Sequence, residues 1–143
     1  MAVELDHQFT TSRSLDDSFS VVTDLEKVVP CVAGASVLEA TSEDSVKAQI
    51  KVKMGALSMT FTGTAALESK DPAAHTAVMV VKSREQGGQG FANATVSFAL
   101  QDGGGSIHTK AQISGKAASM GEGVVYGVLD ALIADFADKL GAL

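Results

Sequence analysis

The chain is 143 residues long, which suits a single domain with a substantial core, and its formal net charge is −6. Because no basic block offsets the acids, we expect no binding to a nucleic-acid backbone. The single cysteine, Cys31, excludes an internal disulfide and fits a reducing compartment.

The first residues carry neither the basic n-region nor the apolar h-region of a signal peptide. No apolar run approaches the roughly 18 residues that span a bilayer. We therefore expect a cytoplasmic protein, and we expect any membrane contact to be peripheral and at the inner face of the cell membrane.

The N-terminal part of the chain predicts one strand and two short helices. Apolar and polar residues alternate over 3–9, which is typical of a half-buried strand. Ser14 is a good N-cap for a short helix over 15–23, and acids follow it in the first turn. A second short helical turn over 25–29 is expected to end at Pro30.

After Gly34 the apolar residues recur with a period of two, which predicts about six strands. The expected strands are 37–41, 46–54, 57–62, 77–81, 92–100 and 107–113. The expected turns between them are 42–44, 55–56, 71–72, 87–88 and 103–105. Consecutive strands joined by short turns favour an antiparallel meander.

The last thirty residues, Ser114–Leu143, contain the one long helix that the sequence predicts. Its apolar residues recur at steps of three and four and define one face: Val125, Leu129, Leu132, Phe136 and Leu140. We expect Asp130, Ala134 and Asp138 on the opposite side, and an ion pair between Asp135 and Lys139. Such a helix must lie against the sheet, because neither element can bury its apolar face alone.

Small residues are frequent at the strand positions assigned to the apolar face of the sheet. They are Ala48, Ala77, Ala92, Ala94, Ala111 and Gly115. Protein interiors normally pack to a density of about 0.74, so small residues beneath a helix imply either very close packing or a cavity. The residues alone leave both alternatives open.

Candidate catalytic or metal-binding residues do not form a pattern. The three histidines, His7, His75 and His108, lack metal-ligand spacing, and only His7 is assigned to the inner face, where it could reach a ligand's polar end. Cys31 is expected to be a buried, inert thiol. The glycine-rich segments 87–90 and 103–105 are interpreted as hairpin turns. We therefore predict no catalytic residue and no metal site.

Four short motifs, in the right order along the chain, resemble the CoxG family, the G subunits of carbon monoxide dehydrogenase. They are the segment 25–35, the segments 51–55 and 61–63 taken together, the segment 113–121, and the aromatic residue Phe136. Ala33 stands where the family usually has a proline, which loosens the predicted turn but leaves Gly34 in place.

The resemblance implies a helix-grip fold of the START-like (SRPBCC) superfamily, formed by residues 1–143 as one α+β domain. In that fold a curved antiparallel sheet of about seven strands wraps around a long C-terminal helix and encloses a deep hydrophobic pocket. The resemblance also implies a part in aerobic oxidation of carbon monoxide or hydrogen, through quinone handling or attachment of the dehydrogenase to the membrane.

Within such a fold we expect methionine, aromatic and small residues from several strands and the helix to line the pocket. The predicted pocket residues are Met54, Met59, Phe61, Met79, Ala94, Phe98, Met120, Tyr126, Leu129 and Phe136. Methionine adapts its shape to a flexible ligand, although each of these residues is equally suited to filling the core. The Tyr126 hydroxyl needs a partner if buried, and a ligand carbonyl could supply it.

The expected function is therefore a non-catalytic carrier that binds a prenylated quinone, with menaquinone the expected ligand, for an aerobic carbon monoxide dehydrogenase or hydrogenase. The alternative is an assembly or membrane-recruitment factor for a molybdenum-containing carbon monoxide dehydrogenase, with the pocket incidental. An enzyme is a third alternative, since some START-like proteins are cyclases or hydrolases, but no acid–base constellation supports it.

Overall fold

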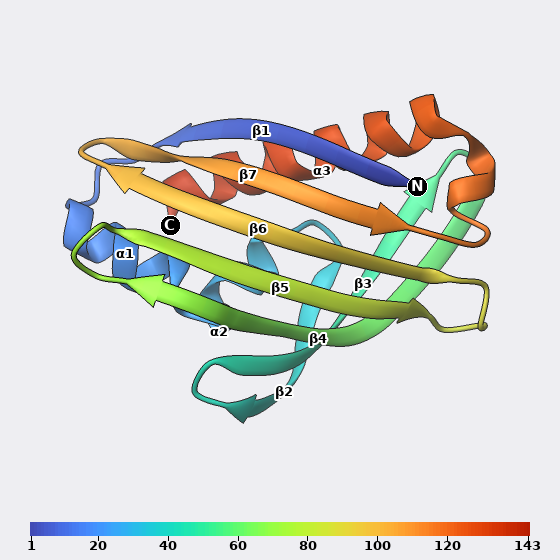
Figure 1. Cartoon of the computed structure of the whole chain (residues 1–143), viewed down its shortest axis with the longest axis horizontal. Helices are drawn as coiled ribbons and strands as arrows, with labels where there is room; N and C mark the ends of the chain where they lie inside the picture. The colour runs from blue at the N-terminus through green and yellow to red at the C-terminus, as the bar shows by residue number, and fades with distance from the viewer.

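The computed structural model describes all 143 residues and is built on one curved antiparallel sheet of seven strands (Figure 1). The strands are β1 (Ala2–Thr10), β2 (Ala35–Ser42), β3 (Ser45–Met54), β4 (Leu57–Asp71), β5 (Thr76–Glu85), β6 (Phe91–Gln101) and β7 (Gly104–Ile113). Their order across the sheet is β1-β7-β6-β5-β4-β3-β2. The predicted meander from β2 to β7 is confirmed, and β1 joins it beside β7, so the chain crosses between the sheet's two edges after β1.

The crossover contains the short helices α1 (Leu15–Val22) and α2 (Leu25–Val28), followed by the 3-10 turn η1 (Val29–Cys31). The predicted N-cap is confirmed, since the Ser14 hydroxyl accepts a hydrogen bond from the Asp17 amide at 3.2 Å. Asp24 caps α2 in the same way by accepting from the Glu26 amide. Pro30 lies in η1, where the helical turn ends as expected.

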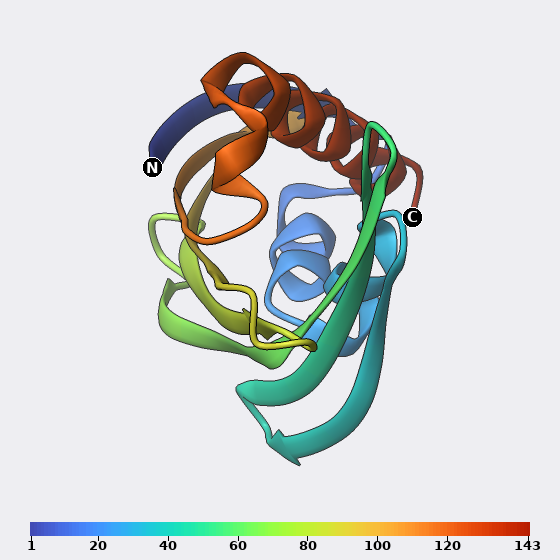
Figure 2. The ribbon, with the colours of Figure 1, turned by 90° about the vertical axis from the view of Figure 1, so that its right-hand side faces the viewer.

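The long helix α3 (Glu122–Ala142) follows the 3-10 turn η2 (Ala118–Met120) and crosses the open side of the curved sheet (Figure 2). The predicted ion pair is present, with Lys139 Nζ 2.9 Å from Asp135 Oδ2. Of the predicted face, Val125, Phe136 and Leu140 are buried, and Leu129 and Leu132 are half-buried. The face is wider than predicted, because Ile133 and Ala137 are buried as well.

Three strand boundaries differ from the expectation by more than two residues, and one of them is the end of β5, at Glu85 rather than at residue 81. Strand β4 runs to Asp71 rather than ending near residue 62. Beyond residue 62 the sequence is Gly63-Thr64-Ala65-Ala66, whose small residues give little contrast between the two faces, and a register shift follows between Leu67 and Ser69. Gly104 and Gly105 belong to β7 and not to the preceding turn. A Cβ atom on Gly104 would lie 2.0 Å from the Phe9 carbonyl oxygen, so glycine here allows close approach of two strands.

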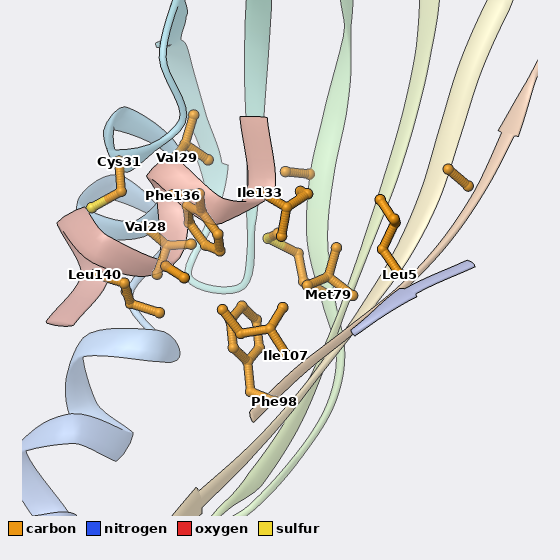
Figure 3. Close-up of a cluster of buried hydrophobic side chains, with 14 of the residues drawn as sticks. Leu5, Val28, Val29, Cys31, Met79, Phe98, Ile107, Ile133, Phe136 and Leu140 are labelled. Atoms are coloured by element: carbon orange, nitrogen blue, oxygen red, sulfur yellow. The ribbon is translucent and has the colours of Figure 1, made fainter. Parts of the chain in front are cut away.

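The hydrophobic core fills the space between α3 and one end of the sheet. Figure 3 shows Phe98 and Ile107 from the sheet facing Phe136 and Leu140 of α3. All four side chains are buried, and the rings of Phe98 and Phe136 have centroids 6.3 Å apart in a tilted arrangement. This packed end holds α3 against the sheet, so any internal space must lie further along the helix.

Candidate functional site

Two adjacent rows of small side chains cross the inner face of the sheet. The first row is formed by Ala111, Ala94, Val81 and Ala65, which are paired across β7, β6, β5 and β4. The second row, two residues along each strand, is formed by Ala92, Ser83, Gly63 and Ala48 across β6, β5, β4 and β3. Because these side chains project only a short way from the sheet, they leave space beneath α3.

That space is a cavity of about 180 Å³ between the sheet, α3 and the α2–η1 segment. Helix α3 contributes Leu129, Leu132, Ile133 and Phe136 to its wall, and Val28, Val29 and Val32 contribute from the crossover. Figure 3 shows Val28, Ile133, Phe136 and Met79 around the same interior region. The sequence left open whether small residues beneath the helix give close packing or a cavity, and the structure has a cavity.

The wall of the cavity is uncharged. Nineteen of its 25 residues are hydrophobic. The other six are neutral: Gln49, Gly63, Thr64, Ser83, Asn93 and Thr109. A buried charge without a partner is strongly unfavourable, and this wall offers no charged partner.

Half of the predicted pocket residues line the cavity: Phe61, Met79, Ala94, Leu129 and Phe136. Three others, Met54, Met59 and Phe98, are buried in the core but do not contribute to the cavity wall. Met120 is half-buried near the β3–β4 turn, with its terminal methyl 3.6 Å from a Cβ built on Gly55. The contact of any of these residues with a ligand stays a prediction.

Tyr126 is placed differently from the expectation of a hydroxyl inside the pocket. Its neighbour Val125 is fully buried, and the helical geometry therefore turns Tyr126 outward, leaving it 48% exposed. Of the small residues assigned to the apolar face, Ala77 is buried as predicted, but it pairs with Phe98 and does not line the cavity. The assignment is wrong only at Gly115, which lies in a turn after β7 with φ +81°.

Several residues of the cavity wall were not predicted from the sequence, notably Ala65, Ser83 and Thr109. Ser83 donates a hydrogen bond from its hydroxyl to the Ala92 carbonyl at 2.5 Å, across the β5–β6 pair. Thr109 is 3% exposed, and its hydroxyl has no hydrogen-bond partner. The alternation along β7 puts Thr109 on the same face as Ile107 and Ala111. Only the pairing between strands shows that this residue borders the same space as the rows of small side chains.

The histidines lie outside the cavity wall. His7 faces α3 as its register indicated, but its Nε2 atom lies 2.9 Å from Asp130 Oδ1, so it contacts the helix. This contact also corrects the prediction that Asp130 lies on the side of α3 away from the sheet. His75 pairs with Asp16 at 3.1 Å and His108 with Asp6 at 2.6 Å, both near the surface.

Cys31 is buried in η1, where its thiol lies 3.4 Å from the Lys27 carbonyl oxygen. Burial raises the pKa of the Cys31 thiol above its ordinary value, and the positive charges of Lys139 and Arg13 oppose this effect only partly. The thiol therefore remains protonated near neutral pH.

No three His, Cys, Asp or Glu side chains are grouped so that they could hold a metal ion. None of the helices has the length and apolar character needed to cross a membrane.

Solved structures with the same architecture cover nearly the whole chain. A conserved protein from Geobacillus kaustophilus is 22% identical, with a TM-score of 0.80 over 99% of this chain and 93% of that one. The Zhui aromatase/cyclase from Streptomyces sp. R1128 is 14% identical, with a TM-score of 0.65 over 99% and 93%. A START superfamily protein from Mycobacterium smegmatis is 13% identical, with a TM-score of 0.57 over 99% and 94%. These likenesses show the fold.

A family model carries the identification further than the structures do. No curated protein sequence matches the chain. The model of the CoxG family, described as the G subunit of carbon monoxide dehydrogenase, matches residues 8–142. The protein therefore belongs to the CoxG family of carbon monoxide dehydrogenase G subunits and has the START-like fold.

Proposed function

We propose that this protein is a non-catalytic carrier that binds a neutral prenylated quinone in the cavity beneath α3. The proposed ligand is menaquinone. The observation that carries the proposal is the composition of the wall, with 19 hydrophobic residues of 25 and no charged side chain. Ligand sites of this kind are mostly apolar and use few polar groups for orientation.

The neutrality of the wall distinguishes between classes of hydrophobic ligand. The carboxylate of a fatty acid would need a cationic or strongly hydrogen-bonding partner inside the protein, because burying it unpaired costs several kcal/mol or shifts its pKa. A quinone carries only carbonyl oxygens on an otherwise apolar ring. The wall, with its few neutral polar groups such as Ser83 and Thr109, suits the quinone better.

The size of the cavity limits how much of such a ligand it encloses. Drug-sized ligands occupy pockets of roughly 300–1,000 Å³, and the cavity measures about 180 Å³. It therefore fits a compact group such as a quinone ring, while a long isoprenoid tail needs α3 to move or must follow the protein surface. Each buried methylene contributes about 0.8 kcal/mol, so even one or two enclosed isoprene units add substantially to affinity.

The partner is proposed from the family. Because the family is named for a subunit of carbon monoxide dehydrogenase, we propose that the carrier exchanges its quinone with an aerobic carbon monoxide dehydrogenase or a hydrogenase. In this proposal the cavity shields the ligand from water between the enzyme and the membrane. The uncharged wall supports a role in ligand binding rather than in catalysis. General acid–base catalysis relies on titratable side chains placed near the reacting group.

The direct test is extraction of the purified protein with organic solvent, followed by mass spectrometry of the extract. We expect a prenylated quinone from the wild type and at least about tenfold less from Ala94→Trp, whose side chain would occupy the cavity. Ala99→Trp is the matched control, because Ala99 is exposed on the same strand. A wild-type protein without quinone that also fails to bind added menaquinone would contradict the proposal.

A second experiment separates the carrier from an assembly or recruitment factor. Carbon monoxide-dependent reduction of menaquinone is measured with purified dehydrogenase, with and without this protein. A carrier raises the rate, and Ala94→Trp removes the increase while Ala99→Trp keeps it. If Ala94→Trp supports the reaction, or membrane recruitment of the dehydrogenase, as well as the wild type does, the recruitment role is favoured and the cavity is incidental.

A further inference from the structure

Thr109 is the one buried hydroxyl group of the cavity wall that lacks a hydrogen-bond partner. It lies in the middle of β7, paired with Leu5 of β1 and Val96 of β6. Its residue is 3% exposed, and both cross-strand neighbours are buried apolar side chains. Buried polar groups in folded proteins are almost always hydrogen-bonded, so an unpaired hydroxyl at such a position requires a reason.

The hydroxyl of Ser83, another residue of the cavity wall, provides a useful comparison. The Ser83 hydroxyl donates its proton to the Ala92 carbonyl and so has no donor left for a ligand. The Thr109 hydroxyl retains both its donor and its acceptor capacity. On a strand two χ1 rotamers are common, and a change from one to the other turns the threonine hydroxyl toward a bound group.

We propose that Thr109 is the hydrogen-bonding anchor of the ligand's head group and allows the protein to hold both redox forms of a quinone. The inference rests on the proposed function. The hydroxyl donates to a quinone carbonyl and accepts from the phenolic group of the corresponding quinol, and the uncharged wall favours neither form. A carrier that takes up one redox form and releases the other must be able to bind both.

The test compares three probes that have the same ring skeleton but differ in polar groups: menadione, menadiol kept reduced under anaerobic conditions, and 2-methylnaphthalene. Their affinities are measured for the wild type, for Thr109→Val, which has nearly the same shape, and for Thr109→Ser, which keeps the hydroxyl. We expect Thr109→Val to bind menadione and menadiol about five- to tenfold more weakly, with unchanged binding of 2-methylnaphthalene. Thr109→Ser is expected to retain most of the affinity for the oxygen-bearing probes.

Ser18→Ala is the matched control, because the Ser18 hydroxyl in α1 is also buried and unpaired but lies outside the cavity wall. It should leave all three affinities unchanged. If Thr109→Val shifts all three probes equally, or none, the hydroxyl is not the anchor, whereas the quinone cavity stands as long as the wild type binds menadione. If the wild type binds no probe at all, the proposed function and this inference both fail. Thermal unfolding of each variant shows whether it is folded before affinities are compared.

Discussion

The guanidinium group of Arg13 donates a hydrogen bond to the main-chain carbonyl oxygen of Leu140 at 2.7 Å, which joins residues 127 positions apart in the chain. The same group also contacts the main-chain oxygens of Gly141 and Leu143. The last carbonyl groups of a helix have no partner within the helix, and a cation close to them also interacts favourably with the helix dipole. Arg13 therefore fastens the C-terminal end of α3 to the segment that follows β1.

Replacing Arg13 by alanine is expected to lower the free energy of unfolding by about 1.5–3 kcal/mol, because a charged donor to these carbonyl groups is lost. Urea denaturation measures the change. Arg84→Ala on the exposed face of β5 is the control and should change stability by less than about 0.5 kcal/mol. Equal effects of the two substitutions would show that the contacts of Arg13 contribute nothing specific.

The buried thiol of Cys31 predicts a pH dependence of stability. Because burial raises its pKa in the folded state, the unfolded chain loses this proton first as the pH rises. The unfolded state then binds fewer protons than the folded state, so the free energy of unfolding falls above the ordinary thiol pKa of about 8.5. The contribution is constant below that pH.

The measurement compares wild type with Cys31→Ala by chemical denaturation between neutral pH and pH 10. Wild type should lose stability relative to the variant only in the alkaline part of this range. A difference between the two proteins that stays constant with pH would contradict the prediction. Folded wild type should also react slowly with a thiol reagent at pH 8, whereas protein unfolded in urea should react at the rate of a free cysteine.

The sheet was predictable because its strands obey a local rule. Period-two alternation and turn residues located every strand, and the resemblance to the CoxG family supplied the overall architecture. Local patterns could not show that β1 pairs with β7, since this contact joins the two ends of the chain. They also missed the length of β4, where small residues after residue 62 weaken the alternation.

The cavity was harder to predict than the sheet because it depends on which residues become neighbours across strands. Ala92 and Ala94 were recognised as small and inward-facing, but Ala65 and Ser83 complete the rows only through the pairing register. The error at Tyr126 has a similar cause. Periodicity shows that α3 has a buried face, whereas the exact rotation of that face depends on packing against β1 and the core.

The cavity itself predicts a conflict between stability and binding. Ala94→Leu adds apolar volume to the space that Ala94 lines, and we expect it to raise the free energy of unfolding by about 0.5–2 kcal/mol. The same side chain should weaken binding of menadione, since it occupies the ligand's volume. Chemical denaturation and a binding titration on the same variant test both effects. Unchanged binding of menadione would show that the ligand does not occupy this space. A loss of stability of the size that overpacking causes, about 1–3 kcal/mol, would show that Ala94 does not face free volume.

The N-terminal turns of α3 are intrinsically weak. The N-cap residue is Gly121, which provides no side-chain hydrogen bond to the helix. Gly123 and Gly127 follow in the first two turns, and a Cβ atom built on either would meet nothing within 4 Å. Neither glycine is therefore required by packing, and each lowers helix stability by about 1 kcal/mol relative to alanine.

We expect Gly123→Ala and Gly127→Ala together to raise the melting temperature and to slow the exchange of a prenylated quinone by about tenfold or more, because opening this end of α3 becomes more costly. Stopped-flow displacement of bound menaquinone measures the exchange rate. Ala134→Gly, at an exposed position nearer the other end of α3, is the control: it should lower the melting temperature and leave exchange unchanged. Unchanged exchange in the double alanine variant would mean that the ligand enters elsewhere and that α3 remains closed during binding.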